Sequence, residues 1–108
     1  MFAVAPRIDR RLLKNVTVRE GEPVYLDVKA TGEPAPEISC THNRKTVMES
    51  ERIRIERVPH NTKYFLDAPI RADTGTYVIT ATNQHGEDTV EIEVTVICTL
   101  TRLIIQSK

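Results

Sequence analysis

The chain has few of the residues with which many small proteins form disulfides or bind metals. Among its 108 residues are no tryptophan, four glycines and two cysteines, Cys40 and Cys98, which lie far apart. Two isolated cysteines predict neither a disulfide framework nor a zinc site, because a structural zinc site needs about four clustered ligands. We therefore expect a domain that folds on its hydrophobic core alone, without metal or cofactor, and we favour a reducing compartment.

The sequence also has no excess of charge and no long apolar run. Its 15 basic residues balance 15 acidic ones, which removes any general electrostatic case for nucleic acid or an anionic membrane. No apolar run approaches the ~20 residues that span a bilayer. We find no phosphate-cradling glycine loop and no catalytic constellation, so we expect a protein that is not an enzyme.

Short alternating runs broken by turn residues indicate an all-β protein. Val24, Leu26 and Val28 alternate with polar residues, and no helix-length stretch shows a period of 3.6 residues. About eight strands at this spacing predict a β-sandwich. We expect one domain over residues 5–97, followed by a tail over 98–108 that is a linker, a strand extension or sequence of cloning origin.

The stretch DTGTYVITATN, residues 73–83, is the most informative motif. Asp73, Gly75, Tyr77 and Asn83 stand at the spacing of strand F in an immunoglobulin domain, where a cysteine is expected two residues after the tyrosine. This chain has Ile79 at that position. The partner position on strand B is Val28, so aliphatic residues replace both halves of the expected bridge.

Together with Gly21 and Glu22 before strand B and the segment 32–36 before strand C, this motif resembles the I-set immunoglobulin domains of intracellular giant muscle proteins of the titin and twitchin type. The resemblance covers nearly all of the chain. It implies two antiparallel sheets with Greek-key topology and, with both bridge positions aliphatic, no intradomain disulfide. The residues that we expect to determine the fold are Val28, Cys40, Leu66, Asp73, Gly75, Tyr77 and Ile79.

One further position departs from the family pattern. The core tryptophan of strand C falls at Cys40, so a thiol replaces an indole. We expect Tyr64, Leu66 or Met48 to fill the space, since a remaining cavity would cost roughly 24 cal/mol per Å³.

The missing bridge bears on the compartment in which the domain works. A disulfide between positions 28 and 79 would contribute roughly 4 kcal/mol, whereas a buried Val or Ile contributes ~1.5 to 3 kcal/mol. Aliphatic residues partly compensate, and in a reducing cytosol they outperform two free thiols. We therefore expect a cytoplasmic domain, and the resemblance implies that its parent is a protein of the muscle sarcomere.

The resemblance implies a structural and protein-binding role as a mechanical spacer and docking module. Val16 and Val18 on an early strand, with Ile92 and Val94 on the last, are our candidates for a clamp between the terminal strands. The family implies neighbouring immunoglobulin or fibronectin type III domains as partners and myosin or other filament proteins as candidate contacts. We expect the domain itself to be monomeric.

Several residues invite a functional interpretation that we weigh against a structural one. Arg52, Arg54 and Arg57 could form a docking face for an acidic partner, although interleaved glutamates favour a solvated strand. Cys40 and His42 would share one strand face, as a ligand pair or a nucleophile with its base would, but a buried thiol beside a rim histidine is the commoner arrangement. We interpret Asp73 and Tyr77 as structural.

Two alternative functions stay open. The first is an extracellular adhesion or receptor domain that has lost its bridge, for which Asn15-Val16-Thr17 would be a glycosylation sequon. The second is a regulatory module next to a kinase in a giant muscle protein. An N-linked glycan on Asn15 would identify the first, and sequence outside residues 1–108 would reveal a neighbouring catalytic domain in the second.

Overall fold

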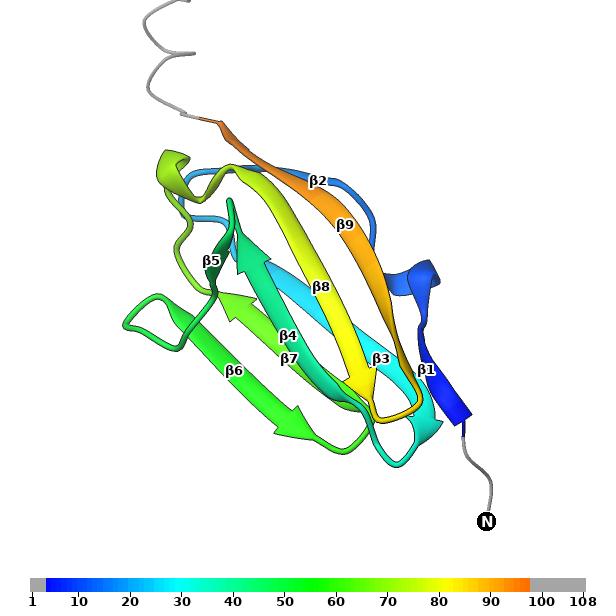
Figure 1. The fold of residues 1–108 in the computed structure, drawn as a ribbon. Coiled ribbons are helices and arrows are strands. Elements are labelled where there is room, and N and C mark those ends of the chain that lie inside the picture. Colours follow the sequence, from blue (N-terminus) through cyan, green and yellow to red (C-terminus); the bar gives the residue numbers. More distant parts are fainter. Residues whose placement is uncertain (1–3, 98–108) are drawn as a thin grey trace, which may run out of the picture.

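Within residues 4–97, nine strands, most with alternating buried and exposed residues, pack as two β-sheets, face to face (Figure 1). The computed structural model describes residues 4–97, so the predicted tail over 98–108 lies outside the described residues. The strands are β1 Val4–Ile8, β2 Val16–Arg19, β3 Val24–Glu33, β4 Glu37–His42, β5 Lys45–Thr46, β6 Ile53–Val58, β7 Asn61–Leu66, β8 Gly75–Asn83 and β9 Gly86–Ile97, with short 3₁₀ turns η1 Arg10–Leu12 and η2 Arg71–Asp73.

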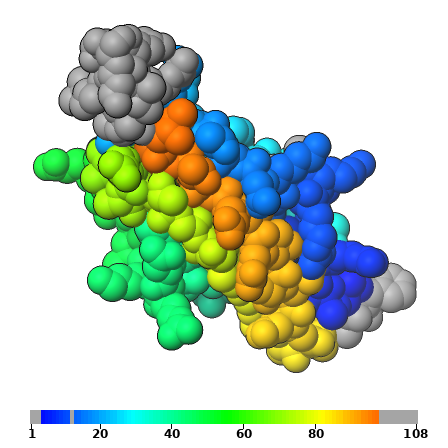
Figure 2. Space-filling model, turned by 90° about the horizontal axis from the view of Figure 1, so that it is seen from above, coloured from blue at the N-terminus to red at the C-terminus, as the bar shows by residue number. Residues whose placement is uncertain are grey.

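The first sheet has the strand order β1-β3-β7-β6, and the second has the order β2-β9-β8-β4-β5. The two-sheet, all-β immunoglobulin-like fold predicted from the sequence is thereby confirmed. One pairing differs from the expectation of purely antiparallel sheets, because β2 runs parallel to β9. The chain passes from β1 through η1 to the other sheet without a hairpin, so β2 continues in the direction of β1 (Figure 1). Figure 2 shows β2, in light blue, alongside β9, in orange.

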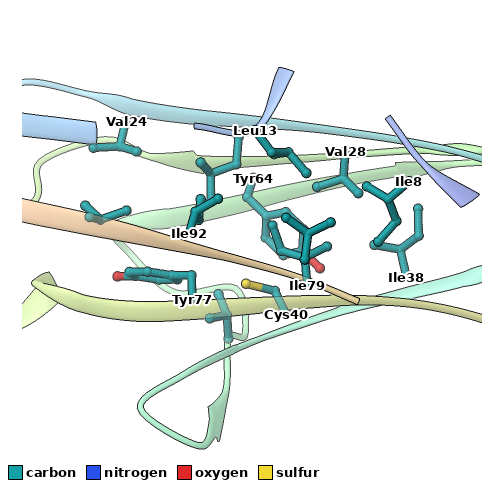
Figure 3. Packing of buried hydrophobic residues seen from close by; sticks show 14 of the residues in the cluster. Ile8, Leu13, Val24, Val28, Ile38, Cys40, Tyr64, Tyr77, Ile79 and Ile92 are labelled. Atoms are coloured by element: carbon teal, nitrogen blue, oxygen red, sulfur yellow. The ribbon is translucent and has the colours of Figure 1, made fainter. Parts of the chain in front are cut away.

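The core lies between the sheets and is built from the inward residues of both. Along β3 the side chains of Val24, Leu26, Val28 and Ala30 are buried, while Tyr25 is exposed. Figure 3 shows this layer, with Val28 on one side and Cys40 and Ile79 on the other. The period of two read from the sequence therefore places the correct face of β3 inward.

The two positions that carry the disulfide in the family pattern hold buried aliphatic side chains in this domain. Val28 and Ile79 both have an exposed fraction of 0%, and the described residues contain no disulfide, since Cys40 is a free, buried thiol. Tyr64 and Leu66 are also buried and help to fill the layer. Met48 is 70% exposed, so the expectation that it fills the space left by tryptophan is wrong: it lies in the segment that leads from β5 to β6, outside the core.

The described chain begins and finishes at opposite ends of the sandwich. The start of β1 lies at one end, and the end of β9 lies at the other (Figure 1). Within residues 4–97 no helix is long and apolar enough to cross a membrane.

Candidate functional site

Asp73 and Tyr77 form a corner between η2 and β8. The Tyr77 hydroxyl donates a hydrogen bond of 2.7 Å to the backbone carbonyl of Asp73, and burial raises the pKa of this tyrosine. The Asp73 carboxylate accepts from the backbone N–H of Ile70 at 2.8 Å and from the Arg52 guanidinium at 2.6 Å. Each group is paired within the domain, which agrees with a structural role for both residues.

Gly75 allows this corner to close. Its backbone φ of +149° is one that residues other than glycine rarely adopt. A Cβ atom placed there would lie 2.6 Å from Asn43 Oδ1 and 2.8 Å from His42 Nε2. Only glycine fits this geometry without displacing its neighbours.

Cys40 and His42 share the inner face of β4, but their surroundings are structural. The His42 ring stacks on Tyr77 with 4.4 Å between ring centroids, and its Nε2 lies 3.0 Å from the carbonyl oxygen of Thr74. Burial raises the pKa of the Cys40 thiol to about 12, so it is a poor nucleophile and a poor metal ligand at neutral pH. Among residues 4–97 no three His, Cys, Asp or Glu side chains gather as a metal site.

The structure does not bring the three predicted docking arginines together. Arg52 is held by Asp73. Arg57 projects from the opposite side of β6 to Arg54, and its guanidinium donates to the carbonyl of Ile38 at 2.7 Å, which links the two sheets. Of the three, only Arg54 belongs to a larger outward cluster.

That cluster is an aromatic strip on the outside of the four-stranded sheet. The Arg54 guanidinium lies 4.5 Å from the centre of the Phe65 ring, and Phe65 stacks on Tyr25 with 4.9 Å between centroids. Tyr25 is 50% exposed. Sequence reasoning overlooked Phe65; the signal was available in the outward position that it occupies opposite Tyr25.

The terminal strands pair in a register that corrects the predicted clamp. Val16 and Val18 lie opposite Val94 and Val96, so Ile92 is not a partner in this ladder. Beyond the ladder, Asn15 Oδ1 accepts from the backbone N–H of Glu93 at 2.9 Å. Sequence reasoning could not fix this offset, because the crossover through η1 sets it.

A second feature that the sequence did not reveal ties the N-terminal segment to β9. The Asp88 carboxylate accepts two hydrogen bonds from Arg10, at 2.7 and 2.9 Å, and one from the backbone N–H of Ile8 at 2.8 Å. These bonds, those from Arg10 first, lower the pKa of Asp88 to about 2. The carboxylate therefore joins two segments that are far apart in sequence.

Comparison with known protein families agrees with this fold and with the tyrosine corner. Residues 6–96 match the family model of the immunoglobulin I-set domain. The chain belongs to the immunoglobulin I-set family.

Relatives of this I-set domain include parts of muscle proteins. It is 36% identical over 83 residues to human "Myosin-binding protein C, slow-type", which is 76% of the chain and 7% of that protein. It is 32% identical over 85 residues to "Muscle M-line assembly protein unc-89" of Caenorhabditis elegans, 78% of the chain and 1% of that protein. A mouse relative, "Leucine-rich repeat and immunoglobulin-like domain-containing nogo receptor-interacting protein 3", is 36% identical over 85 residues, 78% of the chain and 14% of that protein. The chain thus spans a small part of each of these proteins.

Solved structures of titin domains share the fold. A chimeric titin Z1Z2 chain superposes with a TM-score of 0.83 at 27% identity, covering 90% of this chain and 99% of that one. A chain of the titin M10–obscurin-like 1 immunoglobulin complex gives a TM-score of 0.80 at 27% identity, covering 88% and 96%. The I-set domain is therefore related to those of giant muscle proteins.

Proposed function

We propose that this I-set domain is a load-bearing spacer and docking module within a large cytoplasmic protein of the sarcomere. The observation that carries the proposal is the parallel pairing of β2 with β9 in a sandwich whose described chain begins and finishes at opposite ends. A pull on the two ends draws β2 and β9 in opposite directions along their common axis. The hydrogen bonds between them are then loaded together, in shear, instead of one after another.

Two backbone contacts fix which amides take part in this ladder. The N–H of Glu20 donates to the carbonyl of Ile97 at 3.0 Å, whereas the N–H of Arg19 donates to the Glu22 carboxylate, away from β9. Because successive amides in a strand point to opposite sides, the N–H of Val18 faces β9 and that of Thr17 faces away.

Single-molecule force spectroscopy on a tandem array of the domain tests the proposal. Proline at position 18 removes a donor that faces β9, so Val18→Pro should lower the unfolding force clearly. Thr17→Pro is the matched control, since it adds the same ring but removes a donor that faces away, and it should leave the force nearer to that of the parent. Equal forces for the parent and Val18→Pro would contradict a load-bearing role for this ladder.

The proposed compartment and partners rest on the relatives. Proteins named for myosin binding and for M-line assembly contain related domains, and a related titin domain is seen in a complex with an obscurin-like immunoglobulin domain. We extend these associations to this chain as hypotheses: neighbouring immunoglobulin or fibronectin type III domains, and a filament protein such as myosin. The aromatic strip of Tyr25, Phe65 and Arg54 is the candidate docking surface, because exposed aromatic and arginine side chains dominate the energetics of many interfaces.

An extracellular receptor domain is the second candidate. It is favoured by the relative named as a nogo receptor-interacting protein and by the sequon at Asn15, whose side chain and that of Thr17 are exposed. Mass spectrometry of the protein purified from its native tissue separates the two candidates. An N-linked glycan on Asn15 would refute the cytoplasmic assignment, whereas an unmodified Asn15 together with striated localisation in muscle fibres would support it.

A further inference from the structure

A hollow of ≈ 710 Å³ lies beside the point where the chain leaves the four-stranded sheet. After Ile8 the chain turns through η1 toward the other sheet, and the hollow lies where β1 leaves β3, next to the last paired residues, Ile8 and Ala30. The hollow is lined by Arg7, Ile8, Asp9 and Arg10 of the crossover, by Lys29, Ala30 and Thr31 of β3, and by His60 and Asn61 at the turn from β6 to β7. Its volume is within the range of about 300–1,000 Å³ that is usual for binding pockets.

The charges around the hollow are not balanced. The Asp9 carboxylate accepts three hydrogen bonds from Arg11, one from its backbone N–H at 3.0 Å and two from its guanidinium at 3.1 and 3.0 Å. These bonds and, more weakly, the charge of Lys29 lower the pKa of Asp9. The Arg10 guanidinium is held by Asp88. Arg7 and Lys29 are exposed, and neither forms an ion pair within residues 4–97. Two cationic groups at this hollow are therefore free to meet carboxylates.

The rim is closed by a histidine, and the walls are mostly apolar. His60 Nε2 lies 3.0 Å from the carbonyl oxygen of Gly32, and 3.6 Å from the exposed carboxylate of Glu33. The aliphatic stems of Arg7 and Lys29 supply apolar surface here, whereas the side chains of Ile8 and Ala30 are buried in the core between the sheets. An apolar side chain can lie against these stems while flanking carboxylates pair with the two cations.

We propose that this hollow binds an acidic peptide segment of a partner protein, with an apolar side chain against the stems of Arg7 and Lys29 and adjacent carboxylates on their charged groups. The assignment rests on the proposed function as a docking module and adds a second docking surface, whose lining shares no residue with the aromatic strip. Charge complementarity selects the occupant: a basic segment would meet Arg7 and Lys29 unfavourably, and a neutral apolar segment would leave them unpaired.

NMR titration of the ¹⁵N-labelled chain of residues 1–108 tests this assignment. The probe is the peptide acetyl-Glu-Leu-Glu-Leu-Glu-amide, and peptides with Gln or Lys in place of Glu serve as comparisons. We expect amide shift changes at Ile8, at Lys29 to Thr31 and at Asn61, and weaker or no changes with the two comparison peptides. Lys29→Glu should raise the Kd at least about fivefold, because it replaces an attractive charge pair with a repulsive one.

Lys45→Glu is the matched control, since Lys45 is an exposed lysine on β5 of the other sheet and the change in net charge is the same. It should leave the Kd within about twofold. The assignment is overturned if millimolar peptide shifts no amide around the hollow, if the shifts map elsewhere, or if Lys29→Glu and Lys45→Glu weaken binding equally. None of these outcomes touches the spacer function, which the force measurement on Val18→Pro and Thr17→Pro judges independently.

Discussion

Cys40 and Ile79 lie directly opposite each other on β4 and β8, both inside the sandwich (Figure 3). In the family pattern these two positions carry the core tryptophan and one half of the disulfide. Here a small thiol faces an aliphatic side chain, and neither is accessible to solvent. The core of this domain therefore relies on packing where a secreted relative would use a covalent bond.

The Cys40 thiol should be chemically silent in the folded domain. With a pKa of about 12, roughly one thiol in ten thousand is ionised at pH 8. In a Cys98→Ser background, we expect modification by a thiol reagent to proceed only at the rate at which the domain opens, and to become fast in denaturant. Rapid modification under native conditions would contradict the burial described here. Thermal melts of the unmodified chain should not change on addition of reductant.

Two buried tyrosines should respond in opposite ways to loss of the hydroxyl. The Tyr64 hydroxyl is buried and makes no hydrogen bond of good geometry, although the Arg57 guanidinium lies near it, whereas the Tyr77 hydroxyl donates to Asp73. Tyr64→Phe should leave stability unchanged or raise it by up to about 1 kcal/mol, because it removes an unsatisfied polar group. Tyr77→Phe should lower stability by about 1–2 kcal/mol. Urea unfolding of both variants measures the difference, and a destabilised Tyr64→Phe would indicate a partner for this hydroxyl.

Gly75 should tolerate alanine far less well than Gly21. Both have positive φ, +149° and +89°, but a Cβ at position 75 would overlap Asn43 and His42, while nothing lies within 4 Å of a Cβ at position 21. We expect Gly75→Ala to cost about 2–4 kcal/mol and Gly21→Ala about 1–2 kcal/mol, the backbone term alone. Denaturant unfolding of the two variants measures the difference in their free energies of unfolding. Equal losses of stability would contradict a steric contribution at position 75.

Asp88 should make stability depend on pH in the acid range. Its pKa in the folded domain, about 2, is lower than the value of 3.8 expected without these contacts. A lowered folded-state pKa means that the contribution is complete above about pH 4 and is lost as the pH falls toward 2. At pH 7 Asp88→Asn should cost about 1–2 kcal/mol, and its deficit relative to the parent should shrink below pH 4.

The control for this experiment is Glu91→Gln, an exposed carboxylate on the same strand. It should change stability by less than about 0.5 kcal/mol at each pH. A deficit of Asp88→Asn that stays constant between pH 7 and pH 2.5 would show that the carboxylate charge is not what holds Arg10 and Ile8.

Local sequence patterns were sufficient to predict most of the fold. The period of two along β3 and β9 predicted which side chains are buried, and the spacing of Asp73, Gly75 and Tyr77 predicted a corner whose hydrogen bonds and steric limits the structure contains. These features are readable because they depend on residues within a few positions of one another. The docking face was not readable in the same way, because Arg52, Arg54 and Arg57 differ in what they meet across strands.

The sequence by itself determined that this chain is an all-β immunoglobulin domain without its disulfide bridge. The alternation of apolar and polar residues and the corner residues are local properties, and the residues that replace the two cysteines, Val28 and Ile79, are read directly from the sequence. Only the tertiary structure decided the register of β2 on β9, the link from Asp88 to Arg10 and Ile8, the stacking of Arg54 on Phe65, and the hollow beside Lys29. The first two and the hollow depend on where the chain crosses from one sheet to the other, and the Arg54–Phe65 contact depends on the register of the β6–β7 hairpin. Pairing and packing of the sandwich set these placements, and no single short segment does.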